Sequence, residues 1–222
     1  MNGLAFYDFD GTLVSGNVVH QYVWYARRER SLWRQLRLAM LAPALKLADL
    51  YSREWFNHLF YREYRRFSEA WLRKEAENLY SGYVTPHLHD GVEDLLARNA
   101  GEGFVNVLVT GSLDFSMEPV RRHLGFAHVL ANRLEFSAAG RATGRMVPPV
   151  LAGAAKVQAI LDLCRRYNVE PVNCRAYSDD TSDVPMLAAV GQPFAINPKP
   201  GLRRIAAKRG WPILDLPAGR RA

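Results

Sequence analysis

The segment GLAFYDFDGTLV, residues 3–14, runs a short apolar stretch directly into two aspartates, Asp8 and Asp10, and a Gly-Thr pair. An apolar run that ends in turn residues and acidic groups predicts a buried parallel strand. Like charges this close disfavour each other's ionisation. The paired carboxylates at the end of this strand therefore indicate that a cation or a reaction requires both.

Apolar runs of the same kind recur later in the chain, with helical patterns between them. We expect strands at residues 104–110 (FVNVLVT), 174–178 (CRAYS) and 194–197 (FAIN), and helices at 89–100, 115–125, 153–168 and 182–191. Strands that alternate with helices favour an α/β fold built on a parallel sheet.

Residues 17–83 depart from this alternation, because they carry helical patterns and no strand signal. We expect a break at Pro43 and N-caps at Ser52 and Ser68. The sequence thus predicts two domains: residues 1–16 and 84–222 form an α/β core, and residues 17–83 form an all-helical cap.

The positive charge of the chain is concentrated in the helical segment. The formal net charge is +7, and residues 27–74 hold 12 Lys and Arg against 5 Asp and Glu, whereas the rest of the chain is balanced. A basic face can attract phosphate groups, nucleic acid or an anionic membrane, and a solvated helical face is the alternative. No nucleic-acid-reading motif is recognisable, so nucleic acid is not an expected partner.

The stretch LWRQLRLAMLAPALKLADLY, residues 32–51, has two interpretations. It could form an amphipathic surface helix pair that contacts an anionic membrane. Alternatively, its apolar face packs against the rest of the cap.

The cysteines and the opening residues predict a cytoplasmic protein. Cys164 and Cys174 are the only cysteines and lack CxxC spacing, and the first ten residues have neither a basic region nor a long apolar run. A reducing compartment is therefore expected.

Polar residues follow three of the predicted strands, at the edge where open α/β sheets bind ligands. They are Asp8 and Asp10 after the first strand, Thr110, Gly111 and Ser112 (in VTGS) after the second, and Asp179 and Asp183 (in YSDDTSD) after the third. If these strands are neighbours, the carboxylates converge and require a cation. Oxygen-only ligands select a hard metal such as Mg²⁺, and Lys156, at the start of a helix, could balance the remaining charge.

The order DFDGT, VTGS, GAAK and SDDTSD resembles the four motifs of the haloacid dehalogenase superfamily. The helical segment after the first motif resembles the cap of its phosphoserine-phosphatase-like subgroup, and residues 131–144 and 182–214 are similar to that subgroup as well. The resemblance implies a Rossmann-like core with an all-α cap. It also implies a Mg²⁺-dependent phosphatase that acts on a small phosphomonoester through an aspartyl-phosphate.

The resemblance also implies a role for each motif residue. Asp8 would be the nucleophile and Asp10 the general acid and base. The metal ligands would be Asp8, Asp10 through its backbone carbonyl, Asp179 and Asp183. The phosphate would be held by Thr110, Gly111, Ser112 and Lys156.

One departure from the subgroup bears on the substrate. Phosphoserine phosphatases carry a glutamate nine residues after the nucleophile, and Asn17 occupies that position here, where it could bind a polar head group. A phosphoserine or lipid-phosphate phosphatase remains an alternative, and a non-catalytic phosphate-binding module is the alternative from another class. The sequence makes no prediction of oligomeric state.

Overall fold

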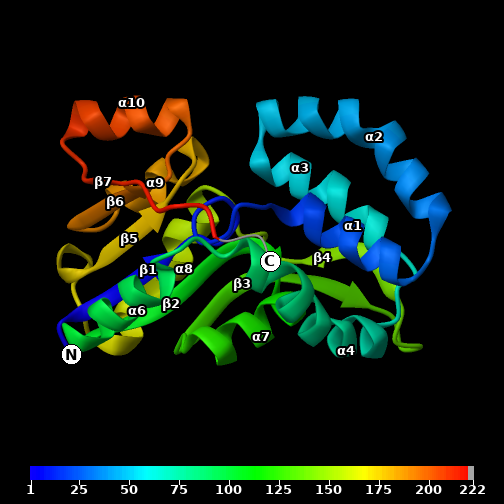
Figure 1. The fold of residues 1–222 in the computed structure, drawn as a ribbon, viewed down its shortest axis with the longest axis horizontal. Coiled ribbons are helices and arrows are strands. Elements are labelled where there is room, and N and C mark those ends of the chain that lie inside the picture. Colours follow the sequence, from blue (N-terminus) through cyan, green and yellow to red (C-terminus); the bar gives the residue numbers. More distant parts are fainter. Residues whose placement is uncertain (220–222) are drawn as a thin grey trace.

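A seven-stranded sheet forms the centre of the molecule in the computed structural model, which describes residues 1–219 (Figure 1). The strand order is β4-β3-β2-β1-β5-β6-β7, and every pair is parallel except β3 with β4. The strands are β1 (Gly3–Tyr7), β2 (Phe104–Leu113), β3 (His128–Phe136), β4 (Ala142–Val147), β5 (Arg175–Ser178), β6 (Gln192–Ile196) and β7 (Ile213–Leu214). The predicted α/β class is confirmed.

Helices fill the connections between the strands. Between β1 and β2 lie α1 (Val18–Arg28), α2 (Leu32–Tyr51), α3 (Arg53–Phe60), α4 (Glu69–Leu79), α5 (Thr85–His87) and α6 (Val92–Gly101). The later helices are α7 (Asp114–Leu124), α8 (Ala154–Tyr167), α9 (Val184–Ala188) and α10 (Pro200–Arg209). Short 3₁₀ helices span Tyr61–Tyr64, Pro171–Asn173 and Thr181–Asp183, and a π-helical turn spans Tyr80–Val84.

Both faces of the sheet are buried, as expected for parallel strands flanked by helices. Successive side chains of β1 alternate between two hydrophobic clusters, with Ala5 and Tyr7 in one and Leu4 and Phe6 in the other. Because the side chains on both sides of the strand are buried in apolar clusters, β1 has no polar side chain facing water before Asp8.

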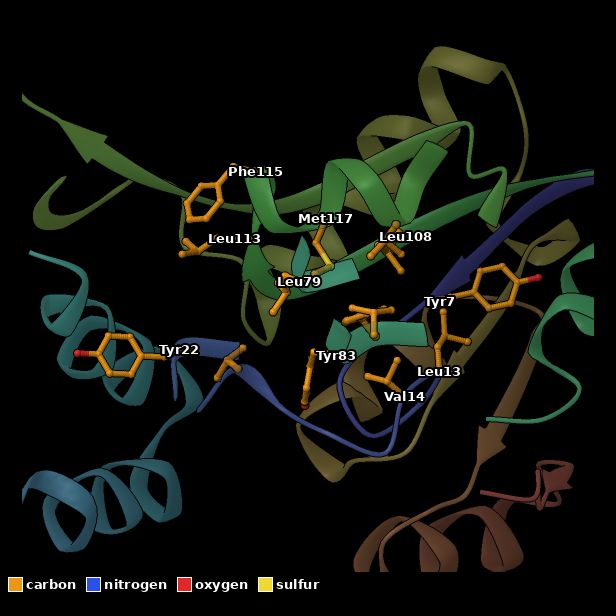
Figure 2. Packing of buried hydrophobic residues seen from close by; sticks show 14 of the residues in the cluster. Tyr7, Leu13, Val14, Tyr22, Leu79, Tyr83, Leu108, Leu113, Phe115 and Met117 are labelled. Carbon is orange, nitrogen blue, oxygen red and sulfur yellow. The ribbon is translucent and has the colours of Figure 1, made fainter. Parts of the chain in front are cut away.

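The helical segment between β1 and β2 shares its core with one face of the sheet. Figure 2 shows Leu79, at the end of α4, close to Met117 of α7, and both belong to the same cluster as Tyr7. The helices α4 and α7 pack against each other. The helical segment is therefore held to the sheet by continuous apolar packing.

The structure corrects the prediction of a break at Pro43. The helix α2 continues through Pro43 from Leu32 to Tyr51. Proline removes one backbone hydrogen bond, the one that would reach the carbonyl of Ala39. Both Pro43 and Ala39 are exposed, so water can solvate that carbonyl.

The expected N-caps are confirmed, whereas the strands β3, β4 and β7 were not predicted. Ser52 and Ser68 accept hydrogen bonds from Trp55 N and Trp71 N at the starts of α3 and α4. Residues 128–147, where no strand is expected from the sequence pattern, form the antiparallel pair β3 and β4 at the sheet edge.

None of the helices among residues 1–219 combines the length and the apolar character that crossing a bilayer requires.

Candidate active site

The three strand ends that carry the predicted site residues lie next to one another. β1 pairs with β2 on one side and with β5 on the other, and Tyr7 is in register with both Leu108 and Tyr177. The residues that follow each strand therefore lie at the same edge of the sheet. This edge brings Asp8, the Thr110–Ser112 turn and Asp179 together.

Asp8 is the buried centre of this edge. Its Oδ1 lies 2.7 Å from Lys156 Nζ, and the same ammonium lies 2.9 Å from Asp183 Oδ1. Burial raises the pKa of Asp8 to about 7, since the opposing effect of Lys156 is partly cancelled by Asp183 and Asp179. Burial alone lowers the pKa of Lys156, but the two carboxylates outweigh it and raise it above its ordinary value.

Asp10 faces a different set of partners. Its carboxylate accepts hydrogen bonds from Ser112 Oγ at 2.6 Å and from Gln21 Nε2 at 2.9 Å. Burial raises its pKa to about 6, and those two hydrogen bonds oppose the shift. Burial thus raises the pKa of both carboxyl groups, opposed at Asp8 by Lys156 and at Asp10 by the hydrogen bonds from Ser112 and Gln21.

Asp179 closes the site from the side of β5. It accepts a hydrogen bond from Thr12 Oγ1 at 3.0 Å and lies 3.2 Å from Lys199 Nζ. Burial raises its pKa, and Lys199 opposes the rise. Gly11 packs directly on this carboxylate, because a Cβ at residue 11 would lie 2.4 Å from Asp179 Oδ2 and the φ of Gly11 is +87°.

The end of β2 is held in a fixed shape. Its pairing with β3 is irregular between Val109 and Leu113. The carbonyl of Gly111 accepts hydrogen bonds from Tyr61 Oη at 2.6 Å and from Asn132 Nδ2 at 2.8 Å. Ser112 N donates to Thr110 Oγ1 at 3.0 Å, so the Thr110 hydroxyl supports the turn from beneath.

A cavity of about 490 Å³ opens above the carboxylates. Of the predicted residues, it is lined by Asp8, Asp10, Asn17, Gly111, Lys156 and Asp183. Thr110, Ser112 and Asp179 are not among the described residues that line it. Its far wall comes from the helical segment, through apolar side chains such as Leu38, Leu45 and Phe56 and the charged Lys46, Asp49 and Arg53.

Two asparagines on the cavity wall differ in how their side chains are used. Asn17 Oδ1 caps α1 by accepting from Val19 N at 3.0 Å and His20 N at 3.3 Å, so it has a structural role that the sequence analysis did not assign. Asn57 is 1% exposed, and its Nδ2 has no hydrogen-bond partner within residues 1–219. A buried donor without a protein partner at a cavity wall is available to an acceptor in the cavity.

Carboxylate oxygens are suitable ligands for a hard cation, although the carboxylates here do not form a close cluster. Within residues 1–219 no three His, Cys, Asp or Glu side chains are gathered as a metal cluster, and Lys156 and Lys199 occupy the positions between carboxylates. Asp8, Asp179, Asp180 and Asp183 supply four carboxylates against the ammonium groups of Lys156 and Lys199 and the Arg53 guanidinium, which lines the same cavity. Carboxylate oxygens are ligands that a divalent ion such as Mg²⁺ accepts.

Sequence reasoning missed several residues that hold the site. Gln21, Tyr61 and Asn132 orient Asp10 and Gly111, Lys199 pairs with Asp179, and Ser178 Oγ donates to Asp183 Oδ2 at 2.8 Å. Ser178 begins the motif SDDTSD, and Lys199 lies in residues 182–214, which are similar to the subgroup. Asn132 lies in residues 131–144, the stretch that is similar to the subgroup, whereas Gln21 and Tyr61 carry no local signal.

Comparison with known proteins agrees with this geometry. The family profile described as haloacid dehalogenase-like hydrolase matches residues 5–188. Phosphoserine phosphatase SerB1 of Mycobacterium tuberculosis is 32% identical in an alignment of 231 positions, which covers 100% of this chain and 73% of that protein. A histidinol-phosphatase of Neisseria meningitidis is 23% identical over 97% of this chain and 99% of its own length.

Solved structures share the fold over nearly the whole chain. A Bordetella pertussis protein of unknown function has a TM-score of 0.85 and 26% identity, and the match covers 97% of this chain and 99% of that one. A substrate-bound phosphoserine phosphatase has a TM-score of 0.70 and 19% identity, over 100% of this chain and 94% of that one. The chain therefore belongs to the haloacid dehalogenase-like hydrolases, as a phosphatase of their phosphoserine-phosphatase-like group.

Proposed function

We propose that this phosphatase hydrolyses a small phosphomonoester through an aspartyl-phosphate on Asp8, with Mg²⁺ as cofactor. The observation that carries the proposal is the placement of Asp8 at the cavity floor, 2.7 Å from the buried Lys156, with a second carboxyl two residues on. An ionised carboxylate beside an ammonium is a nucleophile held at the position where a phosphoryl group would be neutralised.

The proposed reaction has two steps. In the first, Asp8 attacks phosphorus, the bond to the leaving oxygen breaks, and Asp10 donates its proton to that oxygen. In the second, Asp10 takes a proton from water, which attacks phosphorus and releases Asp8 and inorganic phosphate. Ser112 and Gln21 hold the Asp10 carboxyl through both steps.

Asp8, Asp179 and the backbone carbonyl of Asp10 would hold the Mg²⁺, with Asp183 in support. When bound, the ion supplies positive charge that lowers the pKa of Asp8 and stabilises the phosphoryl oxygens. That effect would favour the ionised form of Asp8, which the first step requires.

The proposed phosphate contacts come from both sides of the cavity. Lys156 and the backbone of Gly111 face the phosphoryl group from the sheet edge, and Asn57 Nδ2 faces it from α3 as the donor without a partner. Thr110 and Ser112 act through the turn and through Asp10, and Asn17 fixes the start of α1 beside the substrate.

We also propose that residues 17–83 act as a separate cap domain on a core of residues 1–16 and 84–222. The cap supplies Leu38, Phe56 and Arg53 to the cavity wall, so it would read the part of the substrate beyond the phosphate. Phosphoserine, histidinol phosphate and lipid phosphates are the substrate candidates that the relatives and the partly apolar wall suggest.

Phosphate release across a substrate panel tests this proposal. The panel contains phosphoserine, histidinol phosphate, sugar phosphates, nucleotides and lysophosphatidate, each with Mg²⁺ or with EDTA. Asp8→Asn is the inactive variant, and Asp94→Asn, on the exposed side of α6, is the matched control. Turnover that needs Mg²⁺ and Asp8 but not Asp94 supports the proposal, whereas turnover that survives in Asp8→Asn contradicts it.

A further inference from the structure

The helix α2 carries two apolar stripes, and packing within the chain covers one of them. The inner stripe contains Leu38 and Leu45, which are buried, and Leu41 and Ala48, which are partly buried against the main core cluster. Leu38 and Leu45 also line the active-site cavity. Intramolecular packing of α2 is therefore already accounted for by this side of the helix.

The outer stripe of α2 is exposed along its whole length. Trp33, Leu36, Met40, Leu47 and Tyr51 are 55% to 82% exposed and follow one another at helical spacing. Because a helix turns once in 3.6 residues, these positions lie on the side opposite Leu38 and Leu45. Figure 1 shows α2 at the margin of the molecule, away from the sheet.

This concentration is unlike the rest of the described surface. Among residues 1–219, eight of the ten large apolar side chains that are strongly exposed fall between Leu32 and Trp55. Large exposed apolar patches mark interaction sites, whereas singly scattered residues need no explanation. The outer stripe of α2 therefore has the character of an interaction site.

The charge around the stripe selects the kind of partner. Arg27 and Arg30 are exposed just before α2 begins. Arg28 and Arg37 are near the stripe as well, but they pair with Glu75 and Glu63. Residues 27–74 hold the whole formal excess of positive charge, which is +7. A second copy of the chain would bring an equally basic surface, and like charges would oppose that contact. An anionic lipid surface accepts both the apolar stripe and the basic residues.

We propose that the outer stripe of α2 binds an anionic membrane surface, with the helix lying in the plane of the lipid head groups. Trp33, Leu36, Met40 and Leu47 would enter the boundary between head groups and acyl chains, and the neighbouring arginines would contact lipid phosphates. The opposite side of the same helix lines the active-site cavity, so bound protein would hold that cavity next to the lipid surface. The binding does not depend on the chemistry proposed for Asp8.

Sedimentation with vesicles tests the proposal. The vesicles are made of phosphatidylcholine alone or of phosphatidylcholine and phosphatidylglycerol in equal amounts, at low and at high salt. The test variant is the double substitution Leu36→Asp and Leu47→Asp, neither of which lines the cavity. The matched control is Val172→Asp, an apolar residue 67% exposed in the short helix before β5.

We expect the wild type and Val172→Asp to sediment with the anionic vesicles at low salt and to be released by high salt. The double variant should bind at least about tenfold more weakly, while its circular dichroism and melting temperature match those of Val172→Asp. Failure of the wild type to bind, or equal binding by the double variant, overturns the proposal. A wild-type dimer that the double variant converts to monomer also overturns it, because a second copy would then cover the stripe.

Discussion

At the scale of single residues, Lys156 is the group on which the carboxylate cluster depends. It is 5% exposed and bonds to Asp8 and Asp183 at once, and neither carboxylate could be buried so closely beside the other without it. Two like charges at this separation repel strongly where water is excluded.

We expect Lys156→Met to lower the free energy of unfolding in EDTA by about 3–5 kcal/mol, because it leaves two buried carboxylates without their cation. Urea unfolding checks the value, with Lys208→Met on exposed α10 as the control. The two variants should also differ in phosphate release, which Lys208→Met should leave intact. Equal stability of the two variants would show that Asp8 and Asp183 do not need Lys156.

Gly11 is the second position where a single residue decides the site. Its φ of +87° and its approach to Asp179 leave no room for a side chain. We expect Gly11→Ala to destabilise the fold by about 1–3 kcal/mol and to reduce activity by displacing Asp179. Gly101→Ala is the control, since a Cβ there meets no atom within 4 Å, and thermal unfolding of both variants gives the comparison. An equal melting temperature for the two variants would contradict this account of Gly11.

At the scale of elements, the buried strands next to the site could be predicted from the sequence, whereas the strands toward the sheet edges, β3, β4 and β7, could not. β1 carries a continuous apolar run because both of its faces are covered, and the short β5 is marked by the buried Ala176 and Tyr177. β3 and β4 carry many partly exposed positions, such as Arg133 and Arg145, so neither shows the apolar run on which the strand predictions relied.

At Pro43, tertiary packing overrides the tendency of proline to end a helix. The predicted break is absent because apolar contacts on both sides of Pro43, at Leu38 and Leu45, hold the helix in register. We expect Pro43→Ala to raise the free energy of unfolding, by up to about 3 kcal/mol, since it restores a helical hydrogen bond. Chemical denaturation measures this. A lower stability would show that α2 needs a local distortion at Pro43.

At the scale of the whole molecule, the two chain segments that join the helical segment to the core run side by side. Ser15 N donates to His87 O at 2.8 Å and His89 N donates to Leu13 O at 2.9 Å. Two adjacent connections of this kind can serve as a hinge, and lids of this sort commonly gate substrate entry.

We expect a bound phosphate mimic to slow amide hydrogen exchange in residues 14–17 and 83–90, because closure of the proposed cap would restrict both connections. The Asp8→Asn variant without ligand provides the open reference. Mass spectrometry of exchange over time measures the effect. Identical exchange with and without the mimic would indicate that the cap does not move when phosphate binds.

Site residues could be predicted where they stand in contiguous motifs. Residues that reach the site from distant parts of the sequence could not. Asp8, Lys156 and Asp183 could be named from sequence because each stands in a short pattern. Tyr61 and Asn132 both bond to the carbonyl of Gly111 although 50 and 21 residues separate them from it. No spacing rule links such residues, so only the folded structure identifies them.

The central claim is that Asp8 becomes phosphorylated during turnover. The most direct measurement is the mass of the Asp8-containing peptide from a peptic digest at low pH, after rapid acid quench of the enzyme during turnover of a phosphomonoester. We expect a phosphoryl group on Asp8 in the wild type and none in Asp8→Asn. Steady phosphate release with no modified peptide, or with the phosphoryl group on another residue, would contradict the account.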